Sequence, residues 1–261
     1  MIRDVGHPIV QHIAELRKRS GRDRTGLVIV EGKPEVVRAH QAGVPMRKLV
    51  YCRELSDLEA TDFSADEHIE VSKEVFAACA FGTRLKGIIA ICQPEPLCIA
   101  DLQLSDCPLI LALEGVEKPS NLGAVLRTAD AAKVDAVVLI DGRTDIFNQH
   151  VVRSSIGLVF HVPVTSATRS EAYEFFRARQ LPVFAATSRA EQAYTDCRLD
   201  NPAVILVGNE HEGLSEFWLE AADSQTLIPM GGHGACLNVT VSASILLFEA
   251  RRQRALKKAG R

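Results

Sequence analysis

The stretch LIPMGGHGACLNVTVSASILLFEARRQR, residues 227–254, opens like a strand, passes through three glycines within four positions and continues as a long apolar helix. Glycine adopts backbone conformations that are closed to other residues, so such a loop can fold around a flat ligand and offer it main-chain N–H and C=O groups. Asn238 is expected to begin the helix, whose apolar residues are too many for a single surface stripe. We interpret the stretch as a ligand-binding loop followed by a helix that a domain or a second subunit buries. A flexible glycine loop without a ligand is the alternative.

The composition of the chain limits the classes of function. Of its 261 residues, 47% are hydrophobic and 24% are charged, enough for one large or two modest domains. The formal net charge of −3 gives no general attraction to polyanions, so nucleic-acid binding must come from local patches. No apolar run approaches the roughly 20 residues of a membrane span, and the N-terminus lacks a signal-peptide core, so we expect a cytoplasmic protein without membrane contact. The seven cysteines form no CxxC pair or Cys/His cluster, and we expect reduced thiols and no metal site.

Apolar runs and amphipathic stretches alternate along the chain, which favours α/β units around largely parallel sheets. Residues 93–108 carry three prolines and no periodicity, so we predict a first domain over 1–93, a linker over 94–107 and a second domain over 108–261. Strands are expected at 27–32, 48–52, 68–72, 87–92, 109–116, 136–142, 161–166, 181–188, 203–210 and 226–230. Helices are expected near 8–20, 33–42, 120–133 and 169 onward, before Ala80, after Ser215 and at the C-terminus.

Two further loops follow buried strands of the second domain, where parallel sheets bind ligands. In the helix near 120–133, an apolar stripe leaves Asn121 near the first turn and Arg127 off the stripe, and Arg127 can lean back toward the same crevice. In the second loop, Gly208 and Gly213 bracket the polar pair Asn209 and Glu210. The plainer alternatives are a helix cap, a surface arginine and an ordinary turn.

Three motifs in these loops resemble those of the SpoU/TrmH family of S-adenosylmethionine-dependent RNA 2′-O-ribose methyltransferases, in the SPOUT superfamily. They read NLGAVLR over 121–127, GNEHEGL over 208–214, and IPM over 228–230 with CLNVTVS from Cys236. The first domain, in VIVEGKPEVV and FGTRLKGIIAIC, resembles the ribosomal-protein-like domain with which many members bind their substrate. The resemblance therefore covers nearly the whole chain.

The resemblance implies a C-terminal α/β domain with a parallel sheet and a deep trefoil knot, and a homodimer formed through that domain. It implies S-adenosylmethionine as cofactor, held by Gly208, Asn209, Ile228, Met230, Cys236 and Leu237. It assigns the catalytic roles to Arg127, Asn121, Glu210 and Asn238. Because a guanidinium stays protonated, we expect Arg127 to orient the hydroxyl and stabilise the forming alkoxide. The family usually has serine at the position of Cys236, so the cysteine is a departure.

RNA is the expected partner, ribosomal RNA being favoured over transfer RNA. The segment RSSIG over 153–157 resembles the family's R-x-S-x-G, which assigns Arg153 to a phosphate; a plain helix-end arginine is the alternative. Local positive charge in the first domain predicts further RNA contacts at Arg17, Lys18, Arg19, Arg22 and Arg84. Two other functions remain open, namely a knotted RNA-binding or ribosome-assembly protein with weak or no turnover and a related enzyme that methylates a base.

Overall fold

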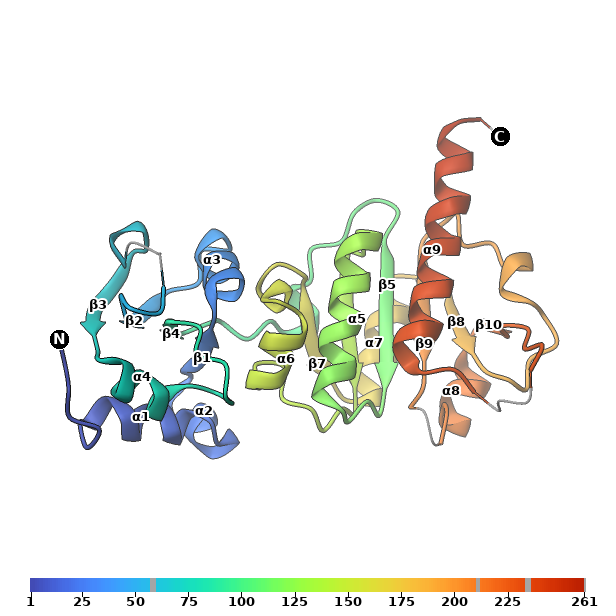
Figure 1. Cartoon of the computed structure of the whole chain (residues 1–261). Coiled ribbons are helices and arrows are strands. Elements are labelled where there is room, and N and C mark those ends of the chain that lie inside the picture. The colour runs from blue at the N-terminus through green and yellow to red at the C-terminus, as the bar shows by residue number, and fades with distance from the viewer. Residues whose placement is uncertain (57–59, 210–211, 233–235, 261) are drawn as a thin grey trace. The chain divides into compact units, whose positions relative to one another are not determined.

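The computed structural model describes residues 1–260 except 57–59, 210–211 and 233–235 (Figure 1). By its contacts the chain forms two compact units, each described here by itself. The first unit is Met1–Pro96 together with Phe147–His161, and the second is Leu97–Ile146 together with Val162–Arg261. Within the described residues, no helix is long and apolar enough to cross a membrane.

The first unit is built on a four-stranded mixed sheet in the order β1-β4-β2-β3. Strand β4 runs antiparallel to β1 and β2, and only the pair β2 and β3 is parallel, so the expectation of a largely parallel sheet is wrong for this unit. The elements are α1 (Pro8–Leu16), α2 (Arg19–Thr25), β1 (Val28–Glu31), α3 (Lys33–Gln41), β2 (Met46–Tyr51), η1 (Ala60–Asp62), β3 (Ala65–Glu70), α4 (Lys73–Cys79), β4 (Ile88–Cys92), α6 (Gln149–Ser154) and η3 (Leu158–Phe160).

The single helix predicted over 8–20 is wrong, because α1 ends at Leu16 and α2 begins at Arg19. The Arg22 guanidinium lies against the end of α1 and donates to the carbonyl oxygens of Leu16 at 2.9 Å and Arg17 at 2.8 Å. These bonds satisfy carbonyls that a helix leaves free at its C-terminus. The break is therefore stabilised by a side chain from the next helix.

The segment Phe147–His161 packs with the first unit, although the sequence analysis placed it within a continuous second domain. The Arg38 guanidinium donates to the carbonyl oxygen of Ile156 at 2.6 Å, and the His161 ring lies 3.0 Å from the carbonyl oxygen of Arg38. Gly157 has φ +79°, and a Cβ there would lie 3.0 Å from the Glu35 backbone. A positive φ and this close approach explain the glycine of the RSSIG segment.

The second unit contains a six-stranded sheet in the order β10-β8-β9-β5-β6-β7, and all of its pairs are parallel, which confirms the parallel sheet expected here. Its elements are η2 (Ile99–Asp101), β5 (Leu109–Glu114), α5 (Pro119–Ala132), β6 (Ala136–Ile140), β7 (Val164–Ala167), α7 (Arg169–Ala178), β8 (Val183–Ala186), η4 (Tyr194–Asp196), β9 (Ala203–Val207), α8 (Glu216–Ala221), β10 (Ser224–Thr226) and α9 (Val239–Lys258).

Helices cover both faces of this sheet, which is why its central strands are apolar on both sides. Helices α5 and α9 lie side by side over one face in Figure 1. On the other face, Phe176 of α7 and Trp218 of α8 are fully buried in a core with alternate residues of the central strands. The carboxyl ends of the strands therefore meet at one edge, where the ligand loops begin.

Candidate cofactor and catalytic site

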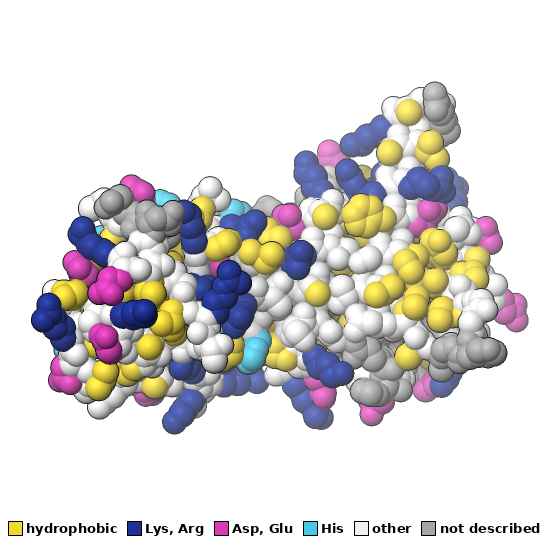
Figure 2. Space-filling view, in the orientation of Figure 1, with side chains coloured by type: hydrophobic (Ala, Val, Ile, Leu, Met, Phe, Trp, Pro, Cys, Tyr) yellow, Lys and Arg dark blue, Asp and Glu magenta, His cyan; other side chains and the backbone are white. Residues whose placement is uncertain are grey.

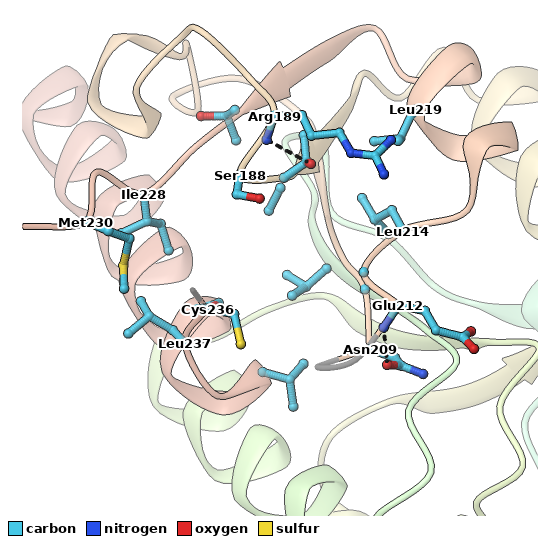
Figure 3. A pocket seen from close by; sticks show the side chains of 18 residues that line it. Ser188, Arg189, Asn209, Glu212, Leu214, Leu219, Ile228, Met230, Cys236 and Leu237 are labelled. Carbon is cyan, nitrogen blue, oxygen red and sulfur yellow. Dashed lines mark hydrogen bonds between the residues drawn. The ribbon is translucent and has the colours of Figure 1, made fainter. Parts of the chain in front are cut away.

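A cavity of about 460 Å³ lies at the carboxyl ends of β8, β9 and β10, beside the start of α9 (Figure 3). Strand β10 ends at Thr226 and Leu227 forms one further parallel bridge with Ala193, so the strand predicted over 226–230 is wrong from Ile228 onward. Ile228 and Met230 instead follow the strand and line the cavity. Because Pro229 lacks an N–H, it cannot donate to a sheet ladder.

The structure brings all six predicted cofactor residues to this one cavity. They are Gly208, Asn209, Ile228, Met230, Cys236 and Leu237. Gly208 is required by packing, since a Cβ there would lie 2.2 Å from the carbonyl carbon of Gly213. The Gly213 N–H donates to the carbonyl oxygen of Asn209 at 3.0 Å, so the loop is closed on itself. In Figure 3 the opposite wall carries Ile228, Met230 and Leu237, and the labelled Cys236 lies beside Leu237.

Sequence reasoning missed another part of the wall, which follows β8. Thr187, Ser188 and Arg189 line the cavity there, and Arg189 forms an ion pair with Glu216 at 2.7 Å. The sequence predicts a strand over 181–188, two residues beyond the end of β8 at Ala186. Its polar residues stand at the carboxyl end of a parallel strand, which was the available signal.

The two asparagines predicted to act in catalysis meet beside the cavity. The side-chain amide of Asn238 donates to Oδ1 of Asn121 at 3.5 Å, although the residues are 117 positions apart. Asn238 also caps α9, since its Oδ1 accepts the N–H of Thr240 at 2.9 Å, which confirms the predicted start of the helix. Further along, the hydroxyls of Thr128 and Ser244 lie 3.1 Å apart and join α5 to α9.

Of the other two predicted catalytic residues, the structure describes only Arg127. Arg127 is exposed on α5 and does not belong to the described residues that line the cavity. Its neighbours in the predicted apolar stripe, Leu122, Val125, Leu126, Ala129 and Ala132, are all buried, so the stripe is confirmed. Glu210 lies outside the described residues.

The prediction that Arg22 contacts RNA is wrong. Its side chain is buried and occupied with the end of α1, so it is not available at the surface for a phosphate. The other cations, Lys18, Arg19, Arg84 and Arg153, are exposed, and Arg17 is partly exposed.

The first unit brings Arg17 and Arg153 together across more than 130 positions. Their guanidinium carbons lie 5.9 Å and 5.8 Å from the centroid of the Phe81 ring, within the range of a cation–π interaction. The Glu31 carboxylate is buried nearby and accepts the N–H of Phe81 at 2.8 Å. Burial raises the pKa of the Glu31 carboxyl, although this hydrogen bond and three neighbouring cations oppose the shift.

Comparisons with known proteins place the chain among RNA methyltransferases. The model of the SpoU rRNA Methylase family matches residues 108–248, and the model of the MRM3-like substrate binding domain matches residues 7–90. The chain is 30% identical over 91% of its length to the 23S rRNA (guanosine(2553)-2′-O)-methyltransferase RlmP of Bacillus subtilis (strain 168), of which 93% is covered.

Solved structures agree over almost the whole chain. An RNA 2′-O ribose methyltransferase superposes with a TM-score of 0.86 at 37% identity, covering 97% of this chain and 99% of that one. An AdoMet-bound rRNA methyltransferase from Sinorhizobium meliloti has a TM-score of 0.87 at 28% identity, covering 96% of this chain and 97% of that one. With its motifs gathered at one edge of a parallel sheet and a family match over more than half of its length, the chain belongs to the SpoU rRNA methylase family.

Proposed function

We propose that the protein is an S-adenosylmethionine-dependent RNA methyltransferase that modifies a ribose 2′-OH of ribosomal RNA. The observation that carries the proposal is the convergence of the second and third motifs on one cavity, beside which Asn121 of the first motif is hydrogen-bonded to Asn238. Membership of the SpoU rRNA methylase family and the likeness to an AdoMet-bound rRNA methyltransferase support this choice of cofactor and substrate.

The cavity fits the cofactor in size and in chemistry. Its volume of about 460 Å³ lies within the usual range of small-molecule sites. The apolar side chains of Ile228, Met230 and Leu237 suit a flat adenine, while the close-packed backbone at Gly208 offers main-chain polar groups. When bound, the cofactor supplies a methyl group on a positively charged sulfonium.

The remaining task of the protein is to position a poor nucleophile and to stabilise the charge that develops on its oxygen. We assign this task to the Arg127 guanidinium, which stays protonated and therefore donates hydrogen bonds to the hydroxyl oxygen or a neighbouring phosphate. Asn121 and Asn238 arrange the polar network at the start of α5 and α9, and Glu210 completes the proposed set.

RNA binding is proposed for the cations of the first unit. Arg153 and Arg17 share the Phe81 ring, so their guanidinium groups are partly ordered before RNA arrives. Lys18, Arg19 and Arg84 are exposed and add phosphate contacts. The match to a substrate-binding domain over residues 7–90 supports this role for the first unit.

A homodimer is proposed through α9. Val241 and Phe248 are 44% and 51% exposed on this helix, and Figure 2 shows hydrophobic side chains at the surface of the second unit around it. Large exposed apolar side chains on one helix indicate a protein interface. We also propose that the C-terminal domain forms a deep trefoil knot. We propose further that the protein is cytoplasmic, in the compartment of its ribosomal RNA substrate.

The test is transfer of labelled methyl from S-adenosylmethionine to ribosomal and transfer RNA prepared from cells that lack this protein. We expect label on ribosomal RNA, located on a ribose by nuclease digestion and mass spectrometry, and its loss in Arg127→Ala. Label on a base would contradict the ribose assignment. Binding of cofactor and RNA without any label would instead favour the assembly-protein function, for which Cys236 in place of serine is the suggestive feature.

A further inference from the structure

The last residue of β5, Glu114, is buried and makes contacts that the mechanism above does not use. Its Oε2 accepts the backbone N–H of Ser215 at 2.8 Å, and its Oε1 accepts the Ser215 hydroxyl at 2.7 Å. The Arg169 guanidinium lies 3.4 Å from Oε1 and 3.5 Å from Oδ2 of Asp141. One carboxylate therefore connects the end of β5 to the start of α8 and the start of α7.

Ser215 directly follows Leu214, and one wall of the cofactor cavity is formed by residues 208–209 and 212–214. Within the loop, Asn209 Oδ1 accepts the N–H of Glu212 at 3.1 Å, in addition to the backbone bond between Asn209 and Gly213. The end of β5 also approaches the loop directly, since a Cβ on Gly115 would lie 3.6 Å from Cβ of Asn209. Asn209 is thus hydrogen-bonded to Glu212 and Gly213 and lies against the end of β5.

We propose that Glu114 is a positioning residue of the cofactor site, which holds residues 212–215 in their binding conformation through Ser215. This inference rests on the proposed function, because it takes S-adenosylmethionine as the ligand. One side chain here accepts hydrogen bonds from both donors of a single serine, which fixes the start of α8 against the end of β5. A loop ordered in advance binds its ligand without a further loss of conformational entropy.

The test is isothermal titration of the full chain with S-adenosylmethionine and with S-adenosylhomocysteine, which needs no turnover. We expect Glu114→Ala to weaken the binding of both about tenfold or more, because the loop must then be ordered by the ligand. Glu114→Gln is the matched variant, since its amide oxygen accepts the Ser215 N–H and its NH₂ group donates to the hydroxyl oxygen. We expect this variant to stay within about threefold of the wild-type affinity.

Steady-state kinetics distinguish positioning from a general loss of structure. In Glu114→Ala we expect the KM for S-adenosylmethionine to rise while kcat at saturating cofactor stays within about threefold. A folded Glu114→Ala variant with wild-type affinity would overturn the proposal. So would a Glu114→Gln variant that loses as much affinity as the alanine variant, because the charge and not the pair of hydrogen bonds would then matter.

A second variant keeps the proposal testable if Glu114→Ala does not fold. Ser215→Ala removes the hydroxyl bond and leaves the carboxylate beside Arg169, and we expect about threefold weaker cofactor binding. Unchanged affinity in a folded Ser215→Ala variant would overturn the role of Ser215. A wild-type protein that binds neither ligand would refute the proposed function itself, and this inference with it, whereas wild-type binding with no effect of either variant refutes the inference alone.

Discussion

Gly208 shows at the scale of one residue how the backbone forms the cofactor cavity. A Cβ there would lie 2.2 Å from the carbonyl carbon of Gly213, a backbone atom that cannot rotate away as a flexible side chain could. We therefore expect Gly208→Ala to open the loop and to weaken cofactor binding by at least about tenfold, measured by titration calorimetry. The matched control is Gly231→Ala, where a Cβ would meet nothing within 4 Å. Equal affinity in the two variants would show that the loop does not bind the cofactor.

Arg127 tests the proposed chemistry. Lysine keeps the positive charge but loses the planar fork of donors, so we expect Arg127→Lys to lower the rate of methyl transfer about 100-fold. Because Arg127 is exposed on α5 and outside the described lining of the cavity, cofactor affinity and stability should stay at wild-type values. Single-turnover transfer to ribosomal RNA measures the rate of methyl transfer. Calorimetry measures the cofactor affinity, and thermal melting measures the stability. A variant with a near-wild-type rate would exclude a requirement for the guanidinium.

Glu31 is expected to give the first unit an unusual dependence on pH. Burial raises the pKa of this carboxyl above its ordinary value of 4.5, so protonation favours the folded state. Its contribution to stability is fully present below the unfolded pKa and is lost as pH rises through the raised folded pKa. Glu31→Gln removes that contribution. We expect the wild type to gain stability relative to this variant between pH 7.5 and 4.5 in urea unfolding, whereas a constant difference would refute the shift.

At the scale of elements, Arg254 connects α9 by hydrogen bonds to the segments that precede β5 and β9. Its guanidinium donates to four carbonyl oxygens, at distances of 2.6 to 3.1 Å, and burial lowers its pKa. The acceptors are Leu199, Cys107, Pro108 and Asn201, in the segments that lead into β5 and β9. The sequence analysis had no basis for this role, since the residue stands in a run of similar basic residues.

We expect Arg254→Ala to lower the free energy of unfolding by roughly 3 kcal/mol, because four carbonyls lose a charged donor. Urea unfolding followed by circular dichroism measures the change. The matched control is the neighbouring Arg251→Ala, whose side chain is exposed and whose loss should cost less than about 0.5 kcal/mol. Equal stabilities of the two variants would mean that the carbonyl contacts contribute little.

Local rules predicted most elements of the second unit, because their signals lie within one element. Thr168 and Glu171 form a capping box at the start of α7, close to the predicted start near residue 169, with the Thr168 N–H donating to the Glu171 carboxylate at 2.7 Å. The errors arose where a side chain from another element decides the local structure. The break after α1 depends on Arg22, and the place of 147–161 depends on Arg38, which no periodicity reports.

In the candidate site, too, residues with a local sequence signal were predicted, and residues whose role depends on another element were missed. Glycine and polar side chains after apolar strands drew attention to the loops, and the resemblance to the SpoU/TrmH family assigned the cofactor and catalytic residues within them. Glu114 was missed because it reads as part of the strand that it ends, and its partner Ser215 is about 100 positions away. Arg189 was missed because the predicted strand continues past Ala186, where β8 ends, so the residues after it did not register as a loop at the strand end.

For the whole molecule, the exposed side chains of α9 give the proposed dimer a direct test. Phe248 is 51% exposed, and we expect Phe248→Asp to place a charge in the interface and to produce monomers, as measured by light scattering and sedimentation. Leu256→Asp, 37% exposed nearer the end of the same helix, is the control that should leave the assembly unchanged if the contact is centred on Phe248. A wild-type monomer at micromolar concentration would refute the dimer.

The segment Phe147–His161 determines how this protein can be divided or recombined. The polypeptide passes from one compact unit to the other three times, after Pro96, after Ile146 and after His161. No single truncation separates the units, because a fragment ending at Pro96 would lack the partner that Arg38 finds at Ile156. A chimera that exchanges the first unit between relatives must therefore transplant two stretches of the gene together, and a library with one crossover near residue 96 should yield mainly misfolded hybrids.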